Sequence, residues 1–361
     1  MRSSISCMTS GALRTYLSRK KNKDHTPETI VNMHHTIIST AGSHSRRALI
    51  PLAAALFGAV LLASCAGRGG ADTGGVESAA ETPAAPVHRL ALPQPPVALA
   101  DPGEQAAYVA EHYWDRFNFA DTTWIADTAA LEQAYANYLS LLPMLPAARA
   151  SAVQRTLIDS AARSSAMLDR FTEMSEHYLY DPNSPMRSEE LYIPVLEALI
   201  ALPGLDDVYK IRPRAQLAMA LKNRPGMVAA DFAYTKADGS VSRLSALRDD
   251  YTVLFFYNPD CPDCKRTKEY IASSEVFSSL QTSGKLAVLA VYTDEDLALW
   301  REHLPEMPRG WTVGYDRGRR ISETELYDLR AIPTLYLLDA RKRVILKDAP
   351  VERIEAWLTN E

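Results

Sequence analysis

The sequence TVLFFYNPDCPDCKRTKEYIASS, residues 252–274, decides the fold of the C-terminal part of the chain. Its first six residues form an unbroken apolar and aromatic run, which is typical of a strand that is buried on both faces of a sheet. Asn258-Pro259-Asp260 then turns the chain, and Cys261-Pro262-Asp263-Cys264 opens a polar helix over Lys265–Ser274. The pattern predicts a strand, a turn and a Cys-x-x-Cys pair at the start of a helix.

A cysteine at the start of a helix is placed to react. The unpaired N–H groups and the positive end of the helix dipole favour the thiolate of Cys261, which is the reactive form of a thiol. Cys264 lies three residues later on the same turn, so the two cysteines can alternate between a dithiol and a disulfide. We therefore predict thiol-disulfide exchange, with Cys261 as the nucleophile and Cys264 as the resolving cysteine.

Two other interpretations of the pair are a structural disulfide and half of a zinc site. Zinc needs four ligands, but the sequence has no second Cys-x-x-Cys pair, and His303 is the only histidine after residue 224. A structural bridge would not need the start of a helix. The redox interpretation is therefore favoured, and no metal or cofactor is expected.

The residues around the pair predict the rest of an α/β domain. An Asp238-Gly239 turn indicates a hairpin. The other expected elements are a buried strand at Leu286–Tyr292, a helix through Leu304 capped by Thr293 or Asp294, a capping box of Ser322 with Glu325, an apolar strand ending at Asp339, a strand at Val344–Lys347 and a closing helix at Val351–Thr359. Together they predict a mixed central sheet flanked by helices.

Residues 226–361 resemble the thioredoxin-fold domain of membrane-anchored, periplasmic thiol-disulfide oxidoreductases. The resemblance rests on the apolar strand running into Cys261-Pro-Asp-Cys264 and on Ala331-Ile-Pro-Thr334, which stands before another apolar strand. It implies that Pro333 is cis and faces the cysteine pair, and that the backbone of Ile332 binds the substrate chain. It also implies a membrane electron donor that reduces the pair again.

Several residues depart from the thioredoxin pattern. Asp260 stands where thioredoxins usually have Trp, Phe255 where they have a buried Asp, and Thr267 where many envelope relatives have Glu. No residue has an obvious general acid/base role, and Glu269 is a weak candidate because helical spacing turns it away from the pair.

The residues beside the first cysteine tune its chemistry. Asp260 and Asp263 bring negative charge to it, whereas Lys265 and Lys268 partly offset that charge, and Pro262 completes the x-x pair. We predict a potential nearer to the about −270 mV of thioredoxin than to the about −120 mV of a strong oxidant.

Residues 104–223 have the hydrophobic periodicity of an all-α domain. Apolar residues recur at helical spacing in three stripes, through Val109–Phe117, Leu131–Leu142 and Val153–Tyr178. Ser188 is the expected N-cap of a helix over Glu189–Leu202, and Pro213 is expected in the first turn of a helix ending near Asn223. These stripes predict four or five helices.

The aromatic residues of this helical part, such as those in 113–121, could line a binding groove, but a core role is favoured. His112 and His177 have no ligand pattern around them. The stretch resembles the uncharacterised helical domain that precedes thioredoxin-like domains in some envelope lipoproteins, a resemblance that carries no activity.

Residues 1–64 are expected to be an N-terminal extension and a lipoprotein signal peptide. Residues 48–63 form an uncharged apolar run behind Arg46 and Arg47, too short to span a membrane. The sequence around Cys65 resembles a bacterial lipobox, which implies that Cys65 is lipidated. We expect translation to begin at Met33, so that Cys7 is not made. Residues 65–103, rich in Gly and Pro, are expected to form a disordered tether.

The composition limits the partners. The chain has 361 residues and a net charge of −5, and residues 1–64 are its basic part, so nothing supports nucleic-acid binding. We expect a lipid-anchored protein of the cell envelope that faces the periplasm and whose partners are disulfide-bearing envelope proteins. The alternative is a lipid-anchored binding or scaffold protein whose cysteine pair is vestigial.

Overall fold

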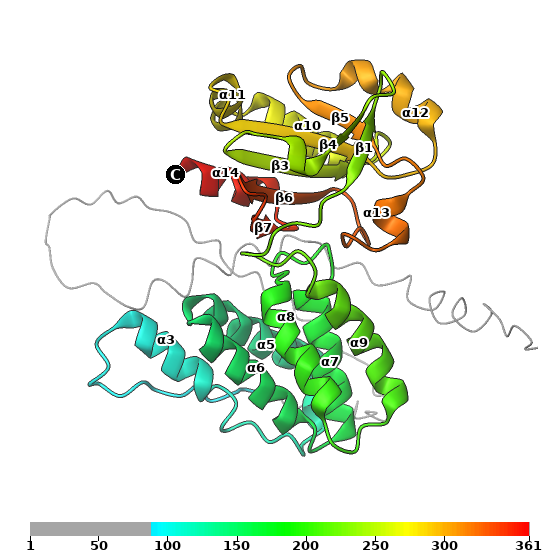
Figure 1. The fold of residues 1–361 in the computed structure, drawn as a ribbon. Coiled ribbons are helices and arrows are strands. Elements are labelled where there is room, and N and C mark those ends of the chain that lie inside the picture. The colour runs from blue at the N-terminus through cyan, green and yellow to red at the C-terminus, as the bar shows by residue number, and fades with distance from the viewer. Residues whose placement is uncertain (1–87, 361) are drawn as a thin grey trace, which may run out of the picture. The chain divides into compact units, whose positions relative to one another are not determined.

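The structure, a computed structural model, describes residues 88–360. The described residues belong to one compact unit of the chain, which spans Glu81–Glu361. Helices fill its first part and a sheet with flanking helices fills its second (Figure 1). The predicted signal peptide, the start at Met33, Cys7 and the lipid site at Cys65 lie outside the described residues. Within them, no helix is long and apolar enough to cross a membrane.

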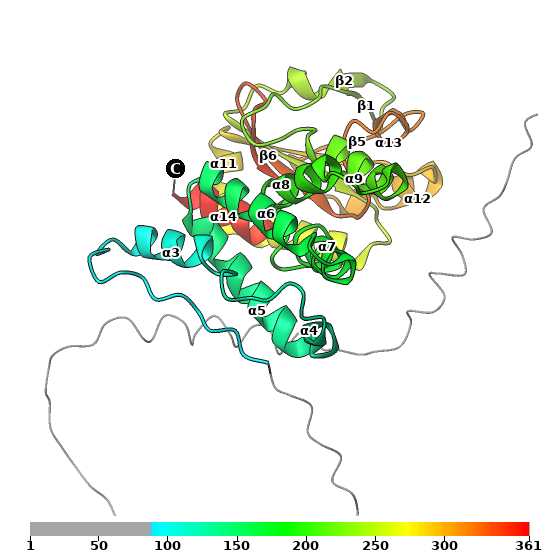
Figure 2. The ribbon, with the colours of Figure 1, turned by 90° about the horizontal axis from the view of Figure 1, so that it is seen from below.

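Seven α-helices of the described chain make up the helical region. They are α3 (Pro102–Glu111), α4 (Thr123–Ala126), α5 (Thr128–Leu141), α6 (Ala147–Ala161), α7 (Ser165–Leu179), α8 (Glu189–Ala201) and α9 (Asp207–Ala220), with the 3₁₀ turn η2 (Leu142–Met144) after α5. Helices α6, α7 and α8 lie side by side (Figures 1 and 2). Ser188 caps α8 as predicted, because its hydroxyl accepts a hydrogen bond from the Leu191 N–H.

The aromatic side chains of the helical region form its core. Trp114 makes edge contacts with Phe117 and Phe171, at ring-centroid distances of 5.2 Å each. Tyr135 and Tyr138 are fully buried in the same cluster. Edge-to-face arrangements of this kind stabilise aromatic cores beyond their buried area. The favoured interpretation of these residues as core is therefore confirmed.

Three expectations for the helical region are wrong in detail. The third apolar stripe is divided between α6 and α7, because Ser164 leaves the helical conformation and caps α7. Pro213 lies inside α9 and not in its first turn. The expected tether does not extend to residue 103: the His88 N–H donates to Asp127 at 3.0 Å, and Leu90 packs on the helical core.

A seven-stranded sheet organises the second part of the described chain. Its strands are β1 (Ala233–Lys236), β2 (Val241–Arg243), β3 (Tyr251–Tyr257), β4 (Leu286–Tyr292), β5 (Thr312–Tyr315), β6 (Thr334–Asp339) and β7 (Val344–Lys347), in the order β2-β1-β5-β4-β3-β6-β7. Strands β3, β4 and β5 are parallel, and the other pairings are antiparallel. The predicted mixed sheet is confirmed.

Helices cover the sheet. They are α10 (Pro262–Ser273), α11 (Glu275–Thr282), α12 (Leu297–Glu302), α13 (Arg320–Glu323) and α14 (Val351–Thr359), with the 3₁₀ turns η3 (Leu244–Ala246) and η4 (Leu304–Glu306). Phe255 of β3 faces a core with α10, α11 and α14, whereas Phe256 faces a second core with the segment around Phe232 and Tyr327. The central strand β3 is thus buried on both faces, as its apolar run predicts.

Two predicted helix caps are wrong. Helix α12 is capped by Asp296, which accepts from two backbone N–H groups, and not by Thr293 or Asp294. The capping box of Ser322 with Glu325 does not form, because α13 ends at Glu323. Its N-terminal N–H groups instead donate to the buried carboxylate of Asp316, and burial raises the pKa of that carboxyl.

The segment that joins the two regions pairs with the sheet. The Val344 N–H donates to the Met227 carbonyl at 2.8 Å, and the Gly226 N–H donates back to the Val344 carbonyl at 2.7 Å. Val228 and Arg343 form an isolated antiparallel bridge. The joining segment therefore pairs with residues 342–344, at the start of β7.

Candidate active site

The cysteine pair stands where β3 meets α10. Strand β3 ends at Tyr257, a turn follows, and Cys261 is the N-cap of α10 with Pro262 in the first helical position. The Cys264 N–H donates to Cys261 Sγ at 3.2 Å. A sulfur at this position receives the unpaired N–H groups and the positive end of the helix dipole, both of which favour its thiolate.

The two thiols differ in exposure. Both are free; Cys261 is half-buried, whereas Cys264 is 2% exposed. Burial, and next the hydrogen bond with Cys261, raises the pKa of the Cys264 thiol well above its ordinary value. Cys261 is therefore the thiol that a partner can reach, whereas Cys264 is covered by the protein.

The cis-proline segment meets the pair from the opposite side. The Ile332–Pro333 peptide bond is cis, and the thiol of Cys261 donates to the Ile332 carbonyl at 3.6 Å. The register of the sheet produces this contact, because Phe256 near the end of β3 is opposite Thr334 at the start of β6. The structure thus places Cys261, Ile332 and Pro333 together, while the roles of Ile332 and Pro333 toward a substrate stay predictions.

Asn258 shapes the turn before the pair, which the sequence Asn258-Pro259-Asp260 predicts, and it also makes a contact that the sequence does not predict. Its side-chain oxygen accepts from the Asp260 N–H at 2.8 Å, and its carbonyl accepts from the Cys261 N–H at 3.2 Å. Its amide donates to Asp294 at 2.5 Å, which ties the turn to the end of β4. Asn258-Pro259-Asp260 is a typical turn sequence, but nothing in the sequence indicates the bond from Asn258 to Asp294.

Two of the charged side chains near the cysteine pair form ion pairs with other residues. Asp263 forms an ion pair with Arg266, and Lys268 reaches Glu306 at 3.5 Å. Asp260 is exposed. Lys268 therefore offsets the aspartates less than the sequence predicts, and the redox potential itself stays a prediction.

None of the three positions where relatives carry an acid/base group, or where one is expected, holds a buried carboxylate. Phe255 is fully buried, Thr267 is buried and Glu269 is exposed. Among residues 88–360, no carboxylate hydrogen-bonds to Cys264. Tyr257 is buried in the same core as Cys264 and accepts a hydrogen bond from the Trp300 indole at 3.1 Å. Burial raises the pKa of Tyr257, so it is a poor base at neutral pH.

A pocket of about 240 Å³ adjoins the cis-proline segment. Residues 329–332 line it, together with Asp294 and Arg319. Ile332 lines the pocket, and its carbonyl accepts from the Cys261 thiol, so this residue connects the pocket with the nucleophile.

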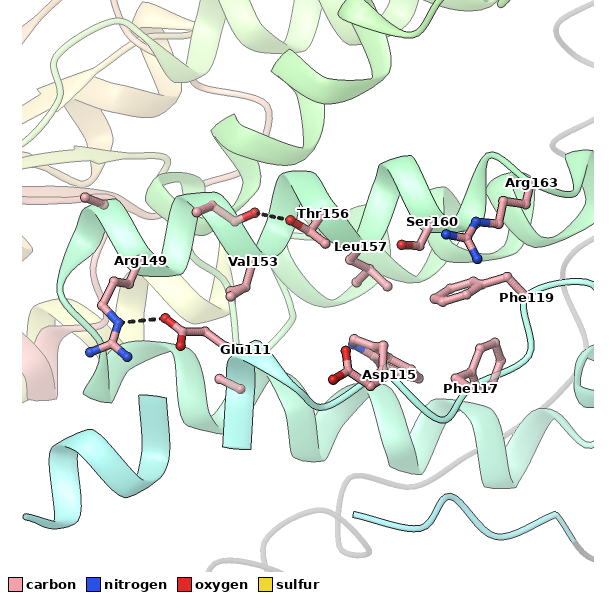
Figure 3. Close-up of a pocket in the computed structure, with 14 residues that line it drawn as sticks. Glu111, Asp115, Phe117, Phe119, Arg149, Val153, Thr156, Leu157, Ser160 and Arg163 are labelled. Carbon is pink, nitrogen blue, oxygen red and sulfur yellow. Dashed lines mark hydrogen bonds and ion pairs between the residues drawn. The ribbon is translucent and has the colours of Figure 1, made fainter. Parts of the chain in front are cut away.

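A larger pocket, of about 600 Å³, lies in the helical region between the segment after α3 and helix α6 (Figure 3). Phe117, Phe119 and Leu157 line it, and Arg149 at one end is bonded to Glu111 at 2.7 Å. The aromatic residues of 113–121 thus line a groove and also belong to the core. No cluster of His, Cys, Asp or Glu suited to a metal ion is found in the part of the chain that the structure describes.

Comparisons with known proteins match two stretches of the chain to different families. Residues 69–223 match a domain of unknown function, DUF5106, and residues 225–347 match the AhpC/TSA family. A thioredoxin-like protein from Bacteroides caccae is 43% identical, and its structure superposes with a TM-score of 0.74 over 76% of this chain and 100% of that chain. The chain belongs to the thioredoxin-like family. The predicted fold and the class of thioredoxin-like oxidoreductase are therefore confirmed.

Other similarities cover the thioredoxin-like part alone. The C-terminal domain of an uncharacterized protein from Bacteroides fragilis is 42% identical over 38% of this chain and 98% of that chain, with a TM-score of 0.38. Nucleoredoxin from Xenopus laevis is 30% identical over 111 residues, 30% of this chain and 26% of that protein. This thioredoxin-like chain thus spans about a quarter of the nucleoredoxin that it matches.

Proposed function

We propose that the protein is a lipid-anchored thiol-disulfide oxidoreductase of the cell envelope that reduces disulfides of envelope proteins. One observation carries the redox proposal. The half-buried Cys261 is the N-cap of α10 with its sulfur toward Ile332 beside the cis bond, while Cys264 is buried behind it. A structural disulfide would need neither the helix start nor the cis-proline segment.

The reaction takes two exchange steps. The Cys261 thiolate attacks one sulfur of the partner disulfide, which forms a mixed disulfide and releases the other partner sulfur as a thiolate that takes up a proton. Cys264 then loses its proton and attacks Cys261 Sγ. A Cys261–Cys264 disulfide forms, and the second partner thiol leaves. The partner gains two electrons, and a membrane electron donor of the envelope supplies them back to the pair.

The anchoring part of the proposal rests on sequence alone. The apolar run of 48–63 and the lipobox-like residues around Cys65 support processing before Cys65 and its lipidation. Mass spectrometry of the N-terminal peptide from a native membrane fraction tests this part. We expect an acylated peptide that begins at Cys65, and an unmodified peptide that begins upstream would contradict it.

Reduction of insulin disulfides tests the redox part. We expect the whole protein to reduce insulin in the presence of a small dithiol, and the Cys261→Ser variant to lose that activity. Cys264→Ser leaves the first step intact and should trap partners as mixed disulfides with Cys261. A captured envelope protein names the substrate. Equal reduction by the wild type and Cys261→Ser would refute the proposed role of the pair.

A second candidate is a lipid-anchored binding or scaffold protein with a vestigial pair. It is favoured by the lack of a carboxylate bonded to Cys264 among residues 88–360 and by the size of the helical region. Wild-type protein that fails to reduce insulin while still binding a partner would support it.

A further inference from the structure

We propose that the helical region holds the substrate-binding cis-proline segment in place through Arg330, which makes Arg330 a positioning residue for polypeptide disulfides. The inference rests on the proposed reduction of protein disulfides and goes beyond it, because it gives the helical region a part in recognising the partner.

The side chain of Arg330 reaches from the cis-proline segment into the helical region. Its Nη2 donates to the Tyr180 carbonyl at 3.1 Å, and its Nη1 donates to Glu189 at 3.4 Å. The guanidinium carbon lies 3.5 Å from the centre of the Tyr180 ring. A planar guanidinium can make the stacking contact and the hydrogen bonds at the same time. Arg330 is thus held by the end of α7 and the start of α8.

The side chains that make these contacts are partly shielded from water. The side chains of Arg330, Glu189 and Asp328 are 23%, 9% and 11% exposed. Asp328 pairs with Arg330, and Lys347 reaches the other oxygen of Glu189 at 2.6 Å. Charged hydrogen bonds in such surroundings are stronger than those on an open surface. Removing Arg330 would therefore free the end of the segment that is next to Ile332, and would do more than remove an exposed ion pair.

The helical region also holds the other end of the same segment. Just beyond the end of α9, Lys222 Nζ donates to the Glu325 carbonyl at 2.6 Å, and the Asn223 amide donates to the Leu326 carbonyl at 2.7 Å. Residues 325–330, which lead into the cis-proline segment, are therefore fixed at both ends by residues of the helical region.

The fixed segment connects directly to the chemistry. Only Ala331 separates Arg330 from Ile332, whose carbonyl receives the Cys261 thiol. Arg330 and Ile332 also line the same pocket of about 240 Å³. A polypeptide that lies along Ile332 also contacts the pocket residues beside it, including Arg330. A small disulfide needs to reach only the sulfur of Cys261. Arg330 should therefore affect the affinity for polypeptides more than the exchange step itself.

Arg224 supplies a matched control. It forms a two-pronged ion pair with Glu190, at 2.9 and 2.6 Å, on the residue next to Glu189. Neither Arg224 nor Glu190 bonds to residues 325–333 among the described contacts. Arg224→Gln removes the same charge near the same helix start without touching the cis-proline segment.

The test uses the pre-reduced whole protein in single turnovers. One substrate is a short fluorescent peptide with one internal disulfide, and the other is bis(2-hydroxyethyl) disulfide. Arg330→Gln should raise the half-saturating peptide concentration about tenfold, the factor that corresponds to about 1.4 kcal/mol, with a much smaller change in the limiting rate. The preference for peptide over small disulfide should fall accordingly. Arg224→Gln should keep the wild-type preference, and Arg330→Lys should lie between.

Two results overturn the inference while the proposed function stands. One is an equal loss toward both substrates in Arg330→Gln, and the other is an unchanged half-saturating peptide concentration in a variant that melts like the wild type. If the wild type reduces neither substrate, the proposed function fails first and the inference fails with it.

Discussion

The burial of Cys264 predicts how the second exchange step responds to pH. This thiol is 2% exposed, its pKa is raised by burial, and no carboxylate among residues 88–360 bonds to it. Below its pKa, the fraction of a thiol in the thiolate form rises about tenfold per pH unit. Because the thiolate is the attacking form, the release step should speed up about a hundredfold between about pH 6.5 and 8.5.

Stopped-flow mixing of the reduced protein with excess Ellman's reagent measures this step. The first burst of coloured thiolate reports attack by Cys261, and the second reports release when Cys264 attacks the mixed disulfide. The Cys264→Ser variant should give the first burst alone. A second burst whose rate changes less than about threefold over this range would refute the reasoning, because it would require an internal base that takes the proton from Cys264.

Two further changes test the packing that supports the site. Lys347→Met removes the cation that contacts Glu189 and three carbonyls at and just after the end of α9, while Arg330 stays beside Glu189, and should lower the free energy of unfolding by about 1–3 kcal/mol in urea titrations. Arg155→Met removes an exposed ion pair and should cost no more than about 1 kcal/mol; equal costs would contradict the importance of burial. Ile271→Ala leaves a cavity where the fully buried side chain of α10 packs and should lower the free energy of unfolding by about 2–5 kcal/mol, measured as a lower melting temperature. A change near zero would show that this core is loosely packed.

The sequence predicts the redox site well because its signals are local. The apolar run of β3 and the Cys-x-x-Cys spacing each lie within one element, and the cis bond before Pro333 is implied by the family resemblance. Helix ends are less predictable, since several polar residues compete for the same cap. Asp316 caps α13 from outside the helix, although Ser322 with Glu325 has the better local pattern.

Contacts between distant segments leave no trace in a single sequence. Arg330 and Glu189 are 141 residues apart, and neither belongs to a recognisable motif. Asn258 and Asp294 are likewise joined only by the parallel pairing of β3 with β4. Pro213 likewise lies inside α9, since the helix begins six residues earlier at Asp207; the preference of proline for a first turn does not fix where a helix begins.

The joining segment has a consequence for how the protein can be divided. The two family matches meet between residues 223 and 225, which invites separate expression of the two halves. Residues 226–229, however, pair with residues 342–344 and so close the edge of the sheet where β7 begins. An open edge strand is a template for aggregation and for strand exchange between molecules. A thioredoxin-like fragment that begins after residue 229 should therefore self-associate, whereas one that begins at residue 224 keeps its own edge closed.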